Sequence, residues 1–252
     1  MTAPPKILPR SYFNRPTLKV ARSLMSKYLV RQTEHGTTAG LIVEVEAYVG
    51  PHDLACHASR GRTPRTDVLF GPPGIAYVYL IYGMYHCLNV VTEREGFPAA
   101  VLIRAVEHRD SSSVLIDGPG RVCRAFQIDL GLNRWDLTVG ERLWLEDRGE
   151  HVTDADIITA PRIGIDYAGE WAAKPWRFYL DGNPWVTKRV ARIVRSRPPC
   201  SSSSSAASTT PTSGSARRRG RSPSSRRSRA SPTGSCLKVK RASTTASEAS
   251  SC

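Results

Sequence analysis

The chain has 252 residues, of which 40% are hydrophobic, and its formal net charge is +14. This length and composition are sufficient for a substantial core in one large domain or two small ones. They argue against a membrane protein, because no apolar run approaches the roughly 18 residues of a spanning helix, and against a disulfide-rich protein, because the six cysteines lack short repeated spacings.

The first predicted elements are a helix and a β-hairpin. The N-terminal stretch MTAPPKILPR lacks the apolar centre of a secretory signal, so we expect a cytoplasmic protein. Helical spacing of apolar residues predicts a helix from Pro16 to Lys27, with Asn14 as its N-cap. Strands over 28–32 and 40–48 follow, and the turn EHGTT between them indicates a hairpin.

The second of these strands contains acidic residues in a run that favours β structure, LIVEVEAY. Successive strand side chains point to opposite faces. The odd-numbered residues from Leu41 to Ala47 are apolar and would face the core. The even-numbered residues, among them Glu44, Glu46 and Tyr48, would face the other way. From this stretch alone, a half-buried strand with a solvated outer face is the simpler interpretation.

A polar loop and a second hairpin come next. The loop over 50–67 carries several arginines close together, which suits contact with phosphates: Arg60, Arg62 and Arg65. In IAYVYLIYGMYHCLNVVT, residues 75–92, two β-favouring runs flank YGM. This pattern predicts a hairpin with Tyr82, Gly83 and Met84 near its tip.

The rest of the globular part is predicted as short elements in irregular order. One of them, a buried strand, contains Arg104, and the last aromatic residue of the chain is Trp185. Strands and helices without a βαβ repeat indicate an α+β fold with a mostly antiparallel sheet. These elements are a buried strand, a turn leading into a helix, two short strands or turns and a closing aromatic segment: residues 98–108, 118–128, 141–147, 162–167 and 176–187.

Residues 196–252 differ in composition from residues 1–195, which we predict to be the folded domain. This Ser/Arg-rich tail has eleven Lys or Arg and one acidic residue, whereas the rest of the chain has 25 and 21, so most of the excess charge is in the tail. It lacks the apolar side chains that offset chain entropy, and we expect disorder. Three interpretations stay open: an electrostatic tether for phosphates, a solvated extension without function, or a reading-frame error.

Several common chemistries find no support in the sequence. The chain has no GxxxxGK[ST], no GxGxxG opening a helix, no HExxH and no GxSxG. Two adjacent Cys/His pairs, Cys56 with His57 and His86 with Cys87, have the side chains that zinc prefers. Neighbouring residues on a strand point to opposite faces, so these pairs do not readily converge, and we expect no metal.

The remaining reactive residues suit the activation of water. Glu44, Glu46 and Tyr48 share a strand face, His57 follows soon after, and Arg104 could pair with a glutamate and hold it ionised. A carboxylate can take a proton from water as the water attacks an electron-poor centre, while aromatic rings offer flat surfaces for a nucleobase.

Ordered blocks from Leu18 to Thr187 resemble one known family. The blocks are EVEAYVGPHDLACHASRGRTPRT, GIAYVYLIYGMYHCLNVV, AVLIRAVE, GPGRVCRAF, and PRIGIDYA with KPWRFYL. Together they are similar to the alkyladenine (3-methyladenine) DNA glycosylase family. Two places depart from its pattern: Arg65-Thr66-Asp67 replaces an Arg-Asn pair, and His108 stands where proline is common.

The resemblance implies a monofunctional glycosylase that excises alkylated or deaminated purines from double-stranded DNA. Hydrolysis of the N-glycosidic bond would leave an abasic site for base excision repair, with no cofactor, no metal and no covalent intermediate. The implied fold is a single compact α+β domain with a curved sheet, flanking helices and a protruding hairpin that inserts into DNA. We expect a monomer in the cytoplasm, associated with the nucleoid in a bacterium.

The resemblance also implies roles for particular residues. Glu46 would be the general base, and Arg104 would help to place Glu46 and the attacking water. Asn89 matches a residue that disfavours guanine through its exocyclic amine. The residues that would stack on the flipped-out base are Tyr48, His57 and Tyr79. The wedge at the hairpin tip would be Tyr82. Two alternatives stay open, a non-catalytic nucleic-acid-binding module with the same fold and a hydrolase of free nucleosides.

Overall fold

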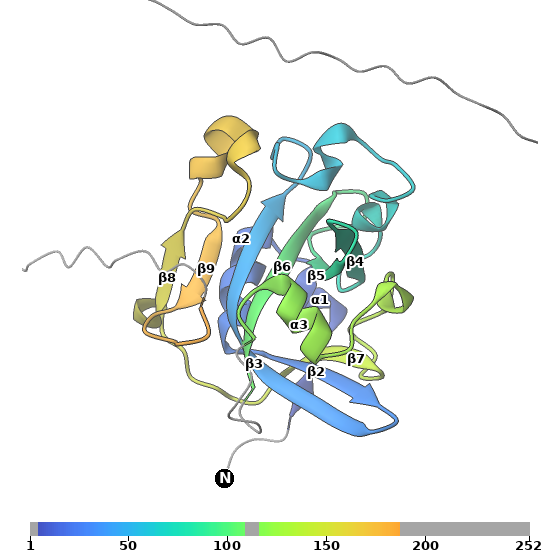
Figure 1. The fold of residues 1–252 in the computed structure, drawn as a ribbon, viewed down its shortest axis with the longest axis vertical. Helices are drawn as coiled ribbons and strands as arrows, with labels where there is room; N and C mark the ends of the chain where they lie inside the picture. Colours follow the sequence, from blue (N-terminus) through green and yellow to red (C-terminus); the bar gives the residue numbers. More distant parts are fainter. Residues whose placement is uncertain (1–4, 109–115, 187–252) are drawn as a thin grey trace, which may run out of the picture. The chain divides into compact units, whose positions relative to one another are not determined.

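Figure 1 shows the fold in a computed structural model, which describes residues 5–108 and 116–186. Every strand pairing in these ranges is antiparallel, and a few short helices pack on the sheet, so the predicted α+β class is confirmed. The predicted tail over residues 196–252 lies outside the described residues. Within the described ranges, no helix is both long enough and apolar enough to cross a membrane.

The long strand β3 is the centre of the sheet. The strand order is β1-β7-β2-β3-β6-β5-β4, and β9 pairs with both β3 and β8. Along one edge β3 pairs first with β2 and then with β9, while β6 pairs with the other edge. The strands are β1 Lys6–Ile7, β2 Tyr28–Thr33, β3 Gly36–Val49, β4 Ala76–Ile81, β5 Tyr85–Val91, β6 Ala99–Glu107, β7 Leu143–Asp147, β8 Ile157–Ala160 and β9 Arg177–Leu180.

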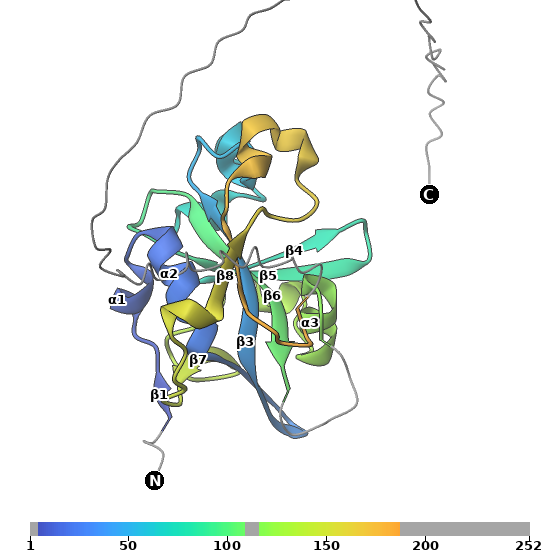
Figure 2. The ribbon, with the colours of Figure 1, turned by 90° about the vertical axis from the view of Figure 1, so that its left-hand side faces the viewer.

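Short helices flank the sheet, and Figure 2 shows α2 and α3 on either side of β3 and β6. The α-helices are α1 Arg10–Phe13, α2 Thr17–Ser23 and α3 Pro119–Ala125. The turn into α3 forms as predicted, because Gly118 adopts a positive φ of 115° and Pro119 takes the first helical position. The 3₁₀ segments are Leu24–Ser26, His57–Arg60, Asp67–Phe70, Leu130–Leu132, Asp154–Asp156 and Asp166–Ala173.

The prediction that Asn14 caps the first long helix is wrong. Helix α2 begins at Thr17, whose backbone N–H and hydroxyl both donate to Oε1 of Glu93, at 3.0 and 2.7 Å. Asn14 instead ends the separate helix α1. The predicted helix ran to Lys27, whereas the residues after Ser23 form a 3₁₀ turn. A carboxylate from a distant segment therefore sets the start of α2.

The main core lies where α2 and α3 meet the central strands. One cluster of fully buried side chains joins these elements. It contains Val20 and Leu24 from α2 and the turn after it, Val122 and Phe126 from α3 and its C-terminal end, and Ile103 of β6. Fully burying a side chain of this kind stabilises a fold by about 1.5–3 kcal/mol. Both helices thus pack in the same cluster against the central strands.

Strand β3 is irregular where its acidic residues begin. Its pairing with β6 shifts register around Glu44, so Val43 on β3 and Arg104 on β6 have no directly opposite partner. Ile42 and Val45 therefore pack in the main core, whereas Val43 packs in a second cluster. The prediction that the odd-numbered positions form one apolar face is wrong, because this bulge reverses the alternation of side chains.

Both faces of β3 are covered over its central residues. Glu44 and Glu46 are 0% exposed, although each carries a carboxylate. The interpretation of a solvated outer face is therefore wrong. Because burying an isolated charge is costly, these two carboxylates need partners inside the protein.

Strands β4 and β5 form an antiparallel hairpin. Ile81 pairs with Tyr85, which leaves Tyr82, Gly83 and Met84 at the tip, as predicted. Tyr82 and Gly83 have φ values of 52° and 69°, in the left-handed region that tight hairpin turns use. Tyr82 is 83% exposed, and Figure 2 shows the hairpin projecting from the rest of the fold. Its insertion into DNA stays a prediction.

Candidate active site

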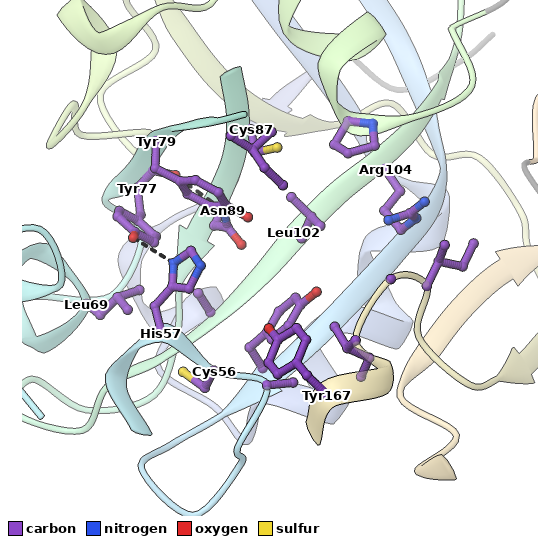
Figure 3. A pocket seen from close by; sticks show the side chains of 18 of the residues that line it. Cys56, His57, Leu69, Tyr77, Tyr79, Cys87, Asn89, Leu102, Arg104 and Tyr167 are labelled. Carbon is purple, nitrogen blue, oxygen red and sulfur yellow. Dashed lines mark hydrogen bonds between the residues drawn. The ribbon is translucent and has the colours of Figure 1, made fainter. Parts of the chain in front are cut away.

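A cavity of about 200 Å³ opens beside the central strands. Figure 3 shows Tyr77 and Tyr79 on one side with His57 next to them, and Tyr167 and Arg104 on the other side. The lining is mostly aromatic and apolar, with a few polar groups that converge on it. Concave cavities that are mostly apolar with a few placed polar groups are typical binding sites for small molecules or parts of larger ligands.

One wall of the cavity is aromatic. Tyr77 and Tyr79 alternate along β4 and so share a face, with ring centroids 5.1 Å apart. The ring of His57 lies 4.6 Å from that of Tyr79, and its Nδ1 is 2.9 Å from the hydroxyl oxygen of Tyr77. Because these contacts fix the three rings to one another, the wall is a ready surface for stacking.

Glu46 lies behind Tyr48 and Arg104, two residues that line the cavity. Its Oε2 accepts a hydrogen bond from the Tyr48 hydroxyl at 2.9 Å, and its Oε1 accepts one from the Ile163 backbone N–H at 2.7 Å. Nη1 of Arg104 is 3.4 Å from Oε1. Burial raises the pKa of Glu46, and these three partners oppose the rise by stabilising the anion. A fixed carboxylate with a raised pKa suits a general base.

Arg104 joins the two buried carboxylates of β3. Its Nε donates to Oε1 of Glu44 at 3.2 Å, so the predicted pairing of Arg104 with a glutamate is confirmed. Nη1 of Arg177 donates to the same oxygen of Glu44 at 2.8 Å. Burial opposes the charge of Arg104, but Glu46 and Glu44 outweigh it and raise the pKa of Arg104. The register shift at Arg104 thus places its guanidinium next to the carboxylates of both Glu44 and Glu46.

The predicted site residues gather around this one cavity. Asn89 is buried on β5 and donates from Nδ2 to the Tyr77 carbonyl oxygen at 3.5 Å, while Tyr82 lines the cavity from the hairpin tip. Glu46 is not among the residues that line the cavity, but it contacts three that do, Tyr48, Ile163 and Arg104. Six of the predicted residues line the cavity: Tyr48, His57, Tyr79, Tyr82, Asn89 and Arg104. Their chemical roles stay predictions.

Three groups at the site were not predicted. Tyr77 had a signal, because it stands two residues before Tyr79 in a strand and so shares its face. Tyr167, 68% exposed on the segment Asp166–Ala173, follows no pattern in the sequence. The Ile163 group is a backbone N–H, which any residue except proline would supply at that position.

The arginines of the loop over 50–67 differ in their partners. Asp67, at the place where the sequence departs from the family pattern, accepts from Arg62 Nε and from Arg134 Nη2, both at 2.6 Å. The guanidinium of Arg65 lies 5.2 Å from the ring centroid of Tyr79, on the aromatic wall. Contact of this loop with phosphates stays a prediction.

The cysteines near the cavity are protonated thiols. Burial raises the pKa of Cys56 to about 11, and burial also raises the pKa of Cys87. Metal ligation requires the thiolate. Over residues 5–108 and 116–186, no group of three or more His, Cys, Asp or Glu side chains is arranged to hold a metal ion.

We expect the folded state to lose stability as the pH falls from about 6.5 to about 4. Burial, with added repulsion from Arg65 and Arg60, lowers the pKa of His57 to about 4, whereas a histidine in the unfolded chain has a pKa of about 6.5. Between these two pH values, His57 of the unfolded chain binds a proton that His57 of the folded protein does not bind. The free energy of unfolding therefore decreases as the pH is lowered. Denaturant titrations across this range should show a weaker pH dependence for His57→Gln than for wild type. His35→Gln, at an exposed turn, is the control, and equal slopes for wild type and His57→Gln would contradict the assignment.

Comparisons with known proteins cover this same part of the chain. A family model described as methylpurine-DNA glycosylase matches residues 11–184. A protein of Methanocella arvoryzae is 50% identical over 197 residues, which cover 73% of this chain and 97% of the relative. A protein of Legionella pneumophila strain Corby is 51% identical over 181 residues (72% and 98%), and one of Myxococcus xanthus is 49% identical over 183 residues (72% and 93%). Each of the three carries the name "Putative 3-methyladenine DNA glycosylase".

Proposed function

The chain belongs to the methylpurine-DNA glycosylase family and is a DNA glycosylase, and from this premise we propose that it excises alkylated or deaminated purines from duplex DNA. The observation that carries this proposal is the setting of Glu46. A fully buried carboxylate, held by a tyrosine, a backbone N–H and an arginine, lies directly behind an aromatic cavity. This arrangement supports hydrolysis of an N-glycosidic bond by activated water.

Glu46 takes a proton from the water that attacks C1′ of the extruded nucleotide. Its raised pKa makes it a stronger base than an exposed glutamate, and Arg104 stabilises the ionised form that the reaction requires. As the glycosidic bond breaks, the sugar gains positive charge, which a fixed, buried carboxylate stabilises. The purine leaves with the bonding electrons, and the product is an abasic site.

The aromatic wall is suited to hold the purine. Stacking on an aromatic side chain contributes about 1–3 kcal/mol per base. Methylation at N3 or N7 makes a purine cationic, and tyrosine faces attract cations. The lowered pKa of His57, about 4, keeps that ring neutral at physiological pH, so His57 itself does not repel a cationic base. The Tyr77 and Tyr79 rings lie beside it.

The hairpin tip is suited to open the duplex. Extruding a base costs a few kcal/mol, and less when the base is damaged or mispaired. Exposed Tyr82 lines the cavity from the tip of a projecting hairpin, where it can fill the gap that the extruded base leaves. No lysine is among the described residues that line the cavity, which favours direct hydrolysis over strand cleavage through a Schiff base.

Tyr82→Ala is expected to slow excision without destabilising the fold, because this side chain is 83% exposed. On a normally paired lesion the rate should fall about tenfold or more, as judged from the ~1–3 kcal/mol of one stacking contact. A lesion opposite an abasic gap should be affected less, since its extrusion costs less. Single-turnover rates on the two duplexes measure the difference, and thermal unfolding is the control. An equal loss on both duplexes would argue against a wedge.

Release of free base from single-lesion duplexes tests the proposed function. Duplexes with 7-methylguanine, hypoxanthine or ethenoadenine should yield free base and an abasic site that breaks only on later alkali treatment. Binding without release would favour the non-catalytic module. Turnover of free nucleosides that is insensitive to salt would favour a nucleoside hydrolase, because binding to duplex DNA weakens steeply as salt is added.

A further inference from the structure

A buried ion pair outside the predicted site joins two loops near Glu46. Asp53 and Arg162 are 109 positions apart in the chain, and both side chains are 0% exposed. Nη1 of Arg162 donates to Oδ2 of Asp53 at 2.5 Å, and Nη2 donates to Oδ1 at 2.8 Å. This is a bidentate pair, the strongest and most directional form of such a contact.

Each member of the pair is also fixed to the backbone around it. Asp53 accepts from the Val49 N–H at 3.2 Å and from the Ala55 N–H at 3.1 Å, so it closes the turn that follows β3. Arg162 donates to the Ala47 carbonyl oxygen at 2.8 Å, and that carbonyl belongs to the strand residue next to Glu46. The pair therefore ties the turn after β3 and the segment around Arg162 to the strand that carries Glu46.

Two of the three polar partners of Glu46 lie next to Arg162. Ile163 is the next residue in the chain, and its N–H donates to Oε1 of Glu46. The Arg162 guanidinium also lies 4.8 Å from the ring centroid of Tyr48, whose hydroxyl donates to Oε2 of Glu46. The guanidinium also lies 5.0 Å from the ring centroid of Trp176. Movement of this one side chain would disturb both hydrogen bonds to the carboxylate.

We propose that the Asp53–Arg162 pair is a positioning element of the reaction, which holds the Ile163 N–H and the Tyr48 hydroxyl against the carboxylate of Glu46. Neither residue of the pair lines the cavity, so the pair itself does not contact the substrate. This inference rests on the proposed role of Glu46 as general base. A purely structural pair would change the stability of the fold and leave the titration of the active enzyme unchanged.

Arg162→Lys tests the proposal, because lysine keeps the charge but cannot make the bidentate pair. The single-turnover rate at neutral pH is expected to fall about ten- to hundredfold, as for a small displacement of a catalytic group, while the affinity for the lesion duplex stays unchanged. The acid limb of the pH–rate profile should move to higher pH. The reason is that the hydrogen bonds from Ile163 and Tyr48 lower the pKa of Glu46, and weaker bonds let it rise.

Two further variants separate positioning from general loss of stability. Asp53→Asn weakens the pair from its other side and should move the acid limb in the same direction. Arg10→Lys is the matched control, because Arg10 also pairs with an aspartate, Asp136, and donates to the Pro73 carbonyl oxygen at 2.6 Å. It should leave the acid limb in place. Because the folded state is itself expected to lose stability as the pH falls, the folded fraction of each variant is measured at every pH and the rates are corrected for it, so that partial unfolding cannot imitate the shift.

Glu46→Gln, measured beside these variants, distinguishes the positioning role of the Asp53–Arg162 pair from the role of Glu46 as general base. If Glu46→Gln is inactive and Arg162→Lys keeps the wild-type acid limb, the positioning inference is overturned and the role of Glu46 stands. A rate loss in Arg162→Lys without a shift of the limb would also overturn it, because that is the result of a structural pair. If Glu46→Gln releases base at the wild-type rate, the proposed general base itself is wrong.

Discussion

Glu46→Gln should lose base excision by a factor of about 10²–10⁴, the usual contribution of a general base. Glutamine has nearly the shape of glutamate, so its side-chain oxygen can still accept from the Ile163 N–H or the Tyr48 hydroxyl, but it cannot take a proton from water. Affinity for a duplex with one lesion should be unchanged, because Glu46 is fully buried. Single-turnover excision and fluorescence anisotropy on the same duplex measure the two quantities.

The same substitution is expected to leave the protein at least as stable as wild type at neutral pH. Burial raises the pKa of Glu46 above its value in the unfolded chain, so the folded state holds a proton more tightly. The ionised carboxylate therefore costs stability, and the cost grows as the pH rises through the folded pKa. Glutamine removes this cost, and the advantage of the variant should be larger at pH 8 than at pH 5.

Glu146→Gln is the matched control for Glu46→Gln. Glu146 is also buried, and it accepts from Trp144 Nε1 at 2.7 Å and from Arg148 Nε at 2.6 Å, on strand β7 away from the cavity. This variant should lose stability and keep full excision activity. A loss of activity in both variants, or a clear loss of stability in Glu46→Gln alone, would contradict the assignment.

The parts of the fold that the sequence predicted are those with local causes. The hairpin around Tyr82 and Gly83 follows from two β-favouring runs on either side of a turn that tolerates positive φ. The turn into α3 follows from Gly118 and Pro119. Glu46 was indicated by the resemblance to the glycosylase family, because the pattern of its strand alone favoured a solvated acidic face.

Contacts between distant segments explain why two predictions were wrong, the N-cap of the first helix and the alternation of side chains along β3. The start of α2 is set by Glu93, which is 76 positions from Thr17 and binds its backbone N–H. Helix-capping rules consider only neighbours in the chain and therefore selected Asn14. The alternation of side chains along β3 fails at Val43, because the pairing with β6 shifts register there. A strand pattern cannot show a bulge that depends on the partner strand.

The contacts near Glu46 that the sequence did not predict are also between segments far apart in the chain. The backbone N–H of Ile163 and the pair of Asp53 with Arg162 bring the segment after β8 to the strand that carries Glu46. A main-chain donor leaves no mark in the sequence, and a single Asp and a single Arg far apart are indistinguishable from surface charges until the fold buries both. Through the family resemblance the sequence could therefore indicate Glu46 as the candidate general base, but not the contacts that hold it.

Arg104→Met should destabilise the protein by about 3–5 kcal/mol, the usual cost of removing one partner from a buried ion pair. Methionine fills a similar space, but Glu44 and Glu46 would stay buried with their shared cation gone. Glu44 keeps the contact with Arg177, so Glu46 is the less compensated acid. Urea denaturation of the two proteins at pH 8 measures the loss.

The loss in Arg104→Met is expected to shrink as the pH is lowered. Burial raises the pKa of Glu46 and Arg104 is the largest influence that lowers it, so the folded pKa rises further without the arginine. The folded variant then holds a proton that the unfolded chain releases, and its stability falls as the pH rises through that higher pKa. Adding Glu44→Gln should recover part of the loss, because it removes the second negative charge, whereas adding the distant Glu146→Gln should not. If Arg104→Met is as stable as wild type at pH 8, the two carboxylates are not both ionised in the native protein, and a water-activating Glu46 would have to acquire its charge only when DNA binds.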